Sequence, residues 1–141
     1  MACTLRAHGV DFDVDAFLHE STLTSCAVFR RGEARLPASQ PEGPRLQRSG
    51  LNVGVSEAEF GDMEQQTRDA LAFLRQNEEE IARLAGYTGV EGIELDFAVY
   101  RGDGFVESFR LPAELASRAG RLGIVLCVST YNAPVPEPTP N

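Results

Sequence analysis

Five arginines between Arg30 and Gly50 are the residues whose type and spacing point most directly to chemistry. With two glutamates they give this segment a net charge of +3, whereas the whole chain of 141 residues carries −8. A guanidinium group presents its N–H donors in a planar fork that matches carboxylates and phosphates. These five side chains are therefore candidates for binding a partner protein or an anion: Arg30, Arg31, Arg35, Arg45 and Arg48.

A structural role for the same arginines stays open. The segment could fold across the acidic surface of its own domain and relieve self-repulsion through exposed ion pairs, each worth about 0 to 1 kcal/mol. A small-ligand or anion site is a further alternative, in which Arg30, Arg31 and Arg101 line a pocket at the strand ends.

The sequence offers little support for a metal site. Asp11, Asp13 and Asp15 have the spacing of the first three ligands of a calcium-binding EF-hand loop. Ala16 stands where that loop needs glycine, and Thr22 stands where it needs a bidentate glutamate. The two histidines and three dispersed cysteines match no compact zinc spacing. We expect no metal and no cofactor, and we expect the aspartates to cap a helix.

Catalytic signatures are missing as well. All 13 basic residues are arginine, so no lysine amine is present for Schiff-base chemistry. No phosphate-binding glycine motif, nucleophile elbow or zinc-protease motif occurs. Cys3, Cys26 and Cys127 lie in apolar surroundings and are expected to be buried, reduced thiols. We therefore expect no enzymatic activity and no catalytic residue.

Composition predicts one globular domain, because 43% of the residues are hydrophobic and 24% are charged. The negative net charge argues against binding to nucleic acid or to an anionic membrane surface. No apolar run approaches the roughly 20 residues that span a bilayer, and the N-terminus lacks the apolar region of a signal peptide. A cytoplasmic location is expected.

The first half of the chain predicts alternating short elements. A strand is expected over residues 3–8, a short helix after Asp13, and a strand that ends at Gly32. Three prolines and a glycine predict a long irregular loop over residues 34–49. Alternating apolar residues predict the next strand over residues 50–56.

The second half begins with a predicted long helix, for which Ser56 and Glu59 would form a capping box and which would end at Gly86. A half-exposed strand follows over residues 92–100. The "RGDG" turn then predicts a hairpin with a returning strand over residues 105–111.

The C-terminal part is expected to hold a helix that starts at Pro112 and a strand over residues 123–131. That strand is apolar on both faces, which is typical of the middle of a sheet. The proline-rich residues 132–141 are expected to form an extended, disordered tail.

These elements predict a single α+β domain over residues 1–131. A mixed or antiparallel sheet of about five or six strands would carry its helices mainly on one face, with ferredoxin-like character. Several stretches also resemble a family of small bacterial α+β domains of unknown function: "FRRGE", "SGLNVGVS", "ALAFLRQNEEEIARLA" and "LGIVLCVSTY". The resemblance spans residues 3–131 and implies a compact fold but no activity, cofactor or catalytic residue.

The leading functional hypothesis is a non-enzymatic domain that binds another protein, as an accessory protein or an inhibitor. Small acidic bacterial proteins include immunity proteins that neutralise toxins, which makes this an analogy at the level of the fold. An acidic body of this kind could cover the basic active site of a nucleic-acid-cleaving enzyme. An exposed edge strand would also allow two copies of the chain to form a homodimer.

Overall fold

The protein is described by a computed structural model, which covers residues 1–24, 27–135 and 138–140. Within them, five strands form one sheet in the order β2-β5-β1-β6-β7, and all neighbours are antiparallel except β6 and β7. The strands are β1 (Cys3–Gly9), β2 (Ala27–Phe29), β5 (Ser49–Ser56), β6 (Gly92–Tyr100) and β7 (Ile124–Tyr131). The expected α+β class with a mixed sheet is confirmed.

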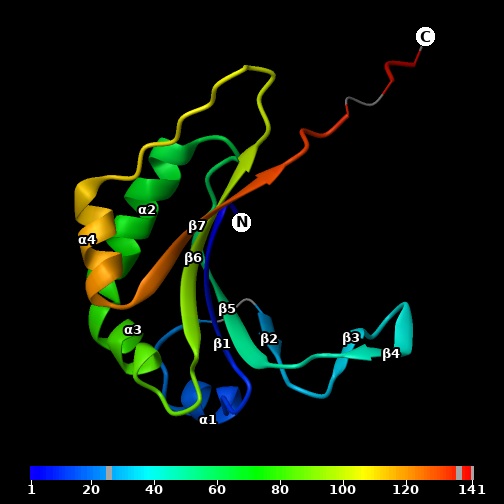
Figure 1. The fold of residues 1–141 in the computed structure, drawn as a ribbon, viewed down its shortest axis with the longest axis vertical. Coiled ribbons are helices and arrows are strands. Elements are labelled where there is room, and N and C mark those ends of the chain that lie inside the picture. The colour runs from blue at the N-terminus through cyan, green and yellow to red at the C-terminus, as the bar shows by residue number, and fades with distance from the viewer. Residues whose placement is uncertain (25–26, 136–137, 141) are drawn as a thin grey trace.

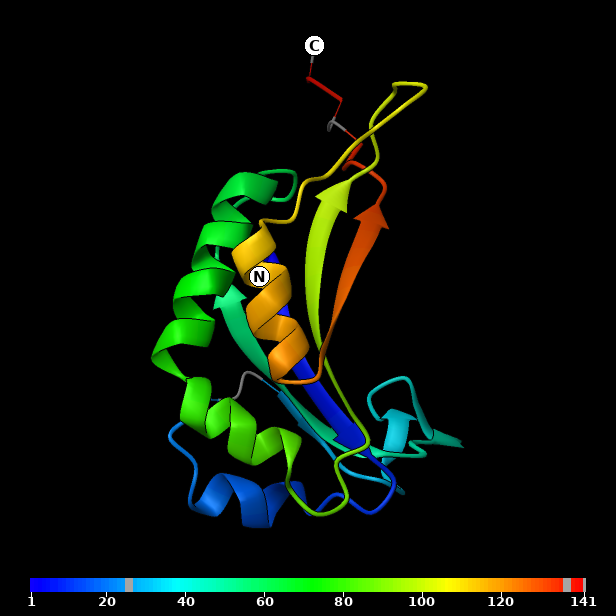
Figure 2. The ribbon, with the colours of Figure 1, turned by 60° about the vertical axis from the view of Figure 1, so that its left-hand side comes forward.

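The helices of the described residues lie on one side of this sheet (Figures 1 and 2). They are α1 (Val14–His19), α2 (Met63–Gln76), α3 (Glu78–Ala85) and α4 (Ala113–Arg121). Helices α2 and α4 lie side by side over the sheet, and α3 and α1 continue the layer toward its lower end in Figure 1. No helix in the described part of the chain has the length and apolar character needed to cross a membrane.

The core fills the space between the helices and the sheet. Every second side chain of β1 and β6 points into it, including Leu5, Leu95 and Phe97, which are fully buried. Buried apolar residues of α2, α3 and α4 cover them: Ala70, Leu74, Ile81, Leu84, Leu115 and Ala119. Burying each larger side chain contributes about 1.5 to 3 kcal/mol, so this layer is the main source of stability.

The single long helix expected after Ser56 is wrong at both its start and its middle. Helix α2 begins after Asp62, whose carboxylate accepts a hydrogen bond from the Gln65 amide at 3.1 Å. The Ser56 hydroxyl instead donates to Asp69 at 2.6 Å. Asn77 separates α2 from α3, and both its backbone amide and its side-chain amide donate to the Phe73 carbonyl at 3.0 Å.

The expected hairpin after β6 is also wrong. Residues 101–112 form no strand, and the chain passes through α4 before β7 returns parallel to β6. Strand β7 therefore lies at the edge of the sheet rather than in its middle. Its apolar character has another cause, because Leu126 and Val128 pack against the core on its helix-covered side.

The segment 34–49 is ordered, where an irregular loop was expected. It forms a separate hairpin of β3 (Ala34–Leu36) and β4 (Gln40–Arg45), which projects on the side away from the helices (Figure 1). Two hydrogen bonds close its base, from the Gly32 amide to Leu46 at 2.9 Å and from the Leu46 amide to Glu33 at 2.8 Å. A two-stranded ribbon has two open edges. Proline is tolerated there because its backbone nitrogen, which lacks a hydrogen, can face solvent.

Two chain connections meet at the lower end with no side chain between them. A Cβ atom on Gly9 would collide with the carbonyl oxygen of Gly89, and one on Gly89 would collide with the backbone of Asp11. Gly89 also has φ +90°, a conformation that favours glycine. The turn after β1 and the turn before β6 are therefore in direct backbone contact.

A buried glutamine of α2 forms hydrogen bonds with β6 next to the first residue of β1. Gln66 is fully buried, and its Nε2 donates to the Ala98 carbonyl at 2.8 Å while its Oε1 accepts from the Ala98 amide at 3.2 Å. The backbone amide of Ala98 also donates to the Ala2 carbonyl at 2.8 Å. Gln66 therefore forms hydrogen bonds with the backbone of β6 just past the first residue of β1, and these bonds connect α2 to β6.

Replacing Gln66 by leucine should lower the free energy of unfolding by about 1 to 3 kcal/mol, because the Ala98 carbonyl loses its partner inside the core. Urea unfolding followed by circular dichroism measures this change. The matched control is Gln76→Leu on the exposed end of the same helix, which should change stability by less than about 0.5 kcal/mol. Equal effects of the two substitutions would contradict a special role for Gln66.

Candidate functional site

Two of the five candidate arginines are held by carboxylates of the protein's own turn and helix. Arg30 binds both carboxylate oxygens of Asp15, at 2.8 and 2.7 Å, and lies 3.4 Å from Glu33. Arg31 lies 3.4 Å from Asp11. The Arg30 guanidinium lowers the pKa of Asp15, and the pKa of Arg30 is raised by the same contact.

The other three arginines do not gather into one cluster. Arg48 lies 3.8 Å from Glu91 and 3.4 Å from the Nδ1 atom of His8. Arg35 and Arg45 are exposed on the hairpin and form no ion pair within the described residues. The geometry thus favours the structural role for Arg30, Arg31 and Arg48 and leaves two guanidinium groups for a ligand.

The pocket expected between Arg30, Arg31 and Arg101 does not form. Arg30 and Arg31 follow β2 at the end of the sheet where Phe29 pairs with Gly50. Arg101 follows the last residue of β6, at the opposite end. Since β6 has 9 residues and a strand rises about 3.3 Å per residue, the two groups lie most of the length of the sheet apart.

The three aspartates of the EF-hand-like pattern serve three separate purposes. Asp13 caps α1 by accepting from the Ala16 amide at 3.0 Å, while Asp11 and Asp15 bind the two arginines described above. Among the residues that the structure describes, no group of three or more His, Cys, Asp or Glu side chains could hold a metal ion.

The open face of the sheet carries a polar network that sequence patterning missed. Asp96 points to this face, as expected, but is only 6% exposed because Arg6 and Ser129 cover it. Arg6 Nη2 lies 3.1 Å from Asp96, and the Ser129 hydroxyl donates to it at 2.6 Å. A shallow groove of about 330 Å³ lies beside this network, lined by Arg6, Ala7, His8, Phe29, Arg48, Asn52 and Glu94.

The two thiols that can be described are poor nucleophiles. Cys3 is fully buried, and burial together with the Asp96 charge raises its pKa to about 12. Burial and Asp96 also raise the pKa of Cys127. Both groups stay protonated near neutral pH, so neither has the thiolate character of a reactive cysteine. Cys26 lies outside the described residues.

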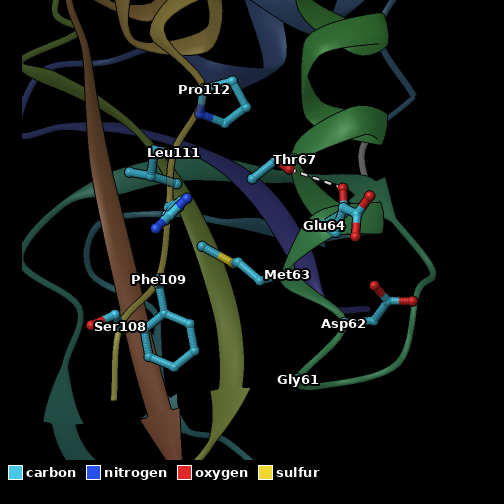
Figure 3. Close-up of a pocket in the computed structure, with 10 residues that line it drawn as sticks. Gly61, Asp62, Met63, Glu64, Thr67, Ser108, Phe109, Leu111 and Pro112 are labelled. Atoms are coloured by element: carbon cyan, nitrogen blue, oxygen red, sulfur yellow. Dashed lines mark hydrogen bonds between the residues drawn. The ribbon is translucent and has the colours of Figure 1, made fainter. Parts of the chain in front are cut away.

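A larger cleft lies between the start of α2 and the segment that leads into α4 (Figure 3). It has a volume of about 810 Å³, and its wall includes Met63, Thr67, Phe109 and Leu111. Phe109 and Leu111 are partly buried and pack against the core. They anchor one end of the irregular segment 101–112 to the body of the protein.

The rest of that segment presents apolar side chains to solvent. Phe105 has a relative exposure of 103% and Val106 of 74%, and neither is part of a strand or helix. At the last residues of β6 and β7, the rings of Tyr100 and Tyr131 lie 5.3 and 5.5 Å from the ring of Phe60. We call residues 101–112 the apolar loop. It is the strongest candidate for a binding surface, since apolar groups exposed together mark interaction sites.

Sequence reasoning missed the apolar loop because its alternation was assigned to a returning strand. The clue was the "RGDG" stretch, which separates Phe105 and Val106 from β6 without providing a partner strand. Apolar residues that have no place in the sheet remain on the surface.

Replacing Arg30 by alanine should raise the pKa of Asp15 to near its ordinary value of 3.8, because the opposing charge and two hydrogen bonds are removed. Since the folded pKa of Asp15 is lowered, this contact stabilises the protein above the unfolded pKa and is lost as pH falls through the folded value. NMR titration of the carboxyl group measures the shift. Arg35→Ala is the control, and an unchanged Asp15 in the Arg30 variant would refute the pairing.

Comparisons with other proteins add no assignment. A scan against protein-family models finds no matching family, and searches of curated proteins and of solved structures find no match either. A function for this chain is therefore inferred from its own surfaces and side chains.

Proposed function

We propose that this domain is a non-enzymatic protein that binds another protein through the apolar loop. The single observation that carries the proposal is the full exposure of Phe105 beside Val106, at the tip of a loop anchored by Phe109 and Leu111. Exposing these groups is unfavourable in water. Burying the phenylalanine side chain in a partner would be worth about 1.5 to 3 kcal/mol.

The surroundings of the loop suit an interface. Aromatic side chains dominate the centres of protein interfaces, and Tyr100 and Tyr131 flank the base of the loop at 36% and 44% exposure. Their contacts with Phe60 limit the side-chain freedom that would be lost on binding. The loop therefore combines projecting anchors with an ordered rim.

Charge indicates the kind of partner. The chain carries −8 overall, and Asp62 and Glu64 line the cleft beside the loop, while Asp103 and Glu107 on the loop itself are balanced by Arg101 and Arg110. A basic partner would be attracted at long range, which speeds association at low salt. An inhibitor or immunity-like protein that covers a basic enzyme site fits this pattern, as the fold-level analogy suggested.

The alternative of an anion-binding domain has less support. Arg30, Arg31 and Arg48 are paired with carboxylates of the same chain, and Arg101 lies at the other end of the sheet. The two arginines that remain on the hairpin, Arg35 and Arg45, are exposed to solvent without an enclosing pocket wall. Bulk water would screen a bound anion there.

Replacing both Phe105 and Val106 by serine should weaken partner binding by at least about 30-fold, or about 2 kcal/mol, because the apolar anchors are removed. A photo-crosslinking amino acid at position 105 identifies the partner in native lysate, and titration calorimetry with that purified partner measures the affinity. The melting temperature should stay within about 2 °C of wild type, since both side chains are exposed.

The matched control replaces Leu36, which is 50% exposed on the hairpin, by serine. This variant should bind the partner like the wild type, and crosslinking from position 36 should not capture it. Equal capture from positions 36 and 105, or full affinity in the double serine variant, would rule out the apolar loop as the binding surface.

A further inference from the structure

The free edge of β7 lacks the features that keep edge strands apart. Its eight residues include no charged residue, no proline and no glycine, and it pairs with β6 on one side only. Natural edge strands are protected by charges, prolines, bulges or short length. The opposite edge of the sheet follows this rule, because β2 spans only 3 of the described residues.

One hydrogen bond sets which backbone groups of β7 face outward. The Tyr131 carbonyl accepts from the Arg101 amide at 2.7 Å, so the backbone of Tyr131 points toward β6. Backbone direction alternates along a strand, in step with its pleat. The N–H and C=O groups of Leu126, Val128 and Thr130 therefore face the free edge.

We propose that two copies of this chain pair through β7, antiparallel and related by a two-fold axis at Val128. In this register Leu126 forms hydrogen-bonded pairs with the partner's Thr130, and Val125 lies opposite the partner's Tyr131. Val125 and Tyr131 are 60% and 44% exposed. In this register Val125 of each copy packs against Tyr131 of the other copy, so both exposed apolar side chains of the strand become covered.

The composition of β7 favours a second copy over an unrelated strand. A two-fold axis places each strand against itself, so a charge near the axis would face its own copy and be repelled. All eight residues are neutral, although the chain as a whole carries −8. The pairing joins the two sheets into one continuous sheet of ten strands. The proposed function rests on Phe105 and Val106 at the tip of the apolar loop, and the two proposals share only Tyr131 at its rim.

A disulfide trap tests both the pairing and its register. In the double variant Val125→Cys with Tyr131→Cys, the thiol at position 125 lies opposite the thiol at position 131 of the other copy. The two thiols are then within the distance that a disulfide spans. Mild oxidation should give a covalent dimer in which peptide mapping finds 125–131 bridges. Either single variant should give at least about tenfold less dimer at these positions. A dimer bridged through Cys127 to Cys127, or no dimer, would overturn the proposed register.

Sedimentation equilibrium of the unmodified chain tests the association itself. Thr130→Pro removes an outward amide at an exposed position and should raise the dimer dissociation constant at least about tenfold, whereas Thr130→Ala should leave it unchanged. The serine double variant of the apolar loop should dimerise like the wild type, which separates this inference from the proposed function. A chain that stays monomeric over a ~100-fold concentration range, or equal dissociation constants for the two Thr130 variants, would overturn the proposal.

Discussion

The burial of alternate side chains under a single layer of helices is the constraint on which the rest of the structure depends. Helices α1 to α4 cover one face of the sheet, so each strand must place every second side chain in that interface. Leu5 and Leu95 face each other across the β1–β6 pair and are fully buried. The other face is left to polar contacts, of which the Arg6–Asp96 pair is the most enclosed.

The one-sided core also explains where the exposed apolar and charged surfaces lie. Side chains on the open face satisfy one another in the network around Asp96, and the arginines beside it are tied to nearby carboxylates. The connection between β6 and α4 has no place in either layer, because β7 occupies the position beside β6. Phe105 and Val106 in this connection therefore stay outside the core, and the same placement leaves the outer edge of β7 open.

Local patterns predicted the elements that depend on local physics. Alternation over residues 3–8 predicted β1, and Asp13 predicted the start of α1 because a capping carboxylate acts within one helical turn. The patterns failed where a distant contact decides the outcome. Ser56 has the spacing of a cap, yet its hydroxyl binds Asp69. The pairing of β7 with β6 and the hydrogen bond from Gln66 to Ala98 each join residues about 30 positions apart. No local spacing in the sequence encodes such contacts.

The candidate arginines show the same division. Their charge was visible in the sequence, but their partners depend on which turns the fold brings together. Asp15 and Arg30 lie 15 positions apart in the sequence and meet only because the fold brings α1 and the residue after β2 together. The exposure of Phe105 likewise depends on the absence of a neighbouring strand, which is a property of the whole sheet.

The backbone contact between Gly9 and Gly89 gives the two ends of the domain different tolerance to sequence change. No side chain fits between these turns, so mutation at either glycine would push apart the connection from β1 to α1 and the connection from α3 to β6. At the far end the irregular connection packs on the core through Phe109 and Leu111, so the exposed residues around Phe105 can change without disturbing the core. A domain built in this way can vary its surface at one end while the contacts at the other end preserve the fold.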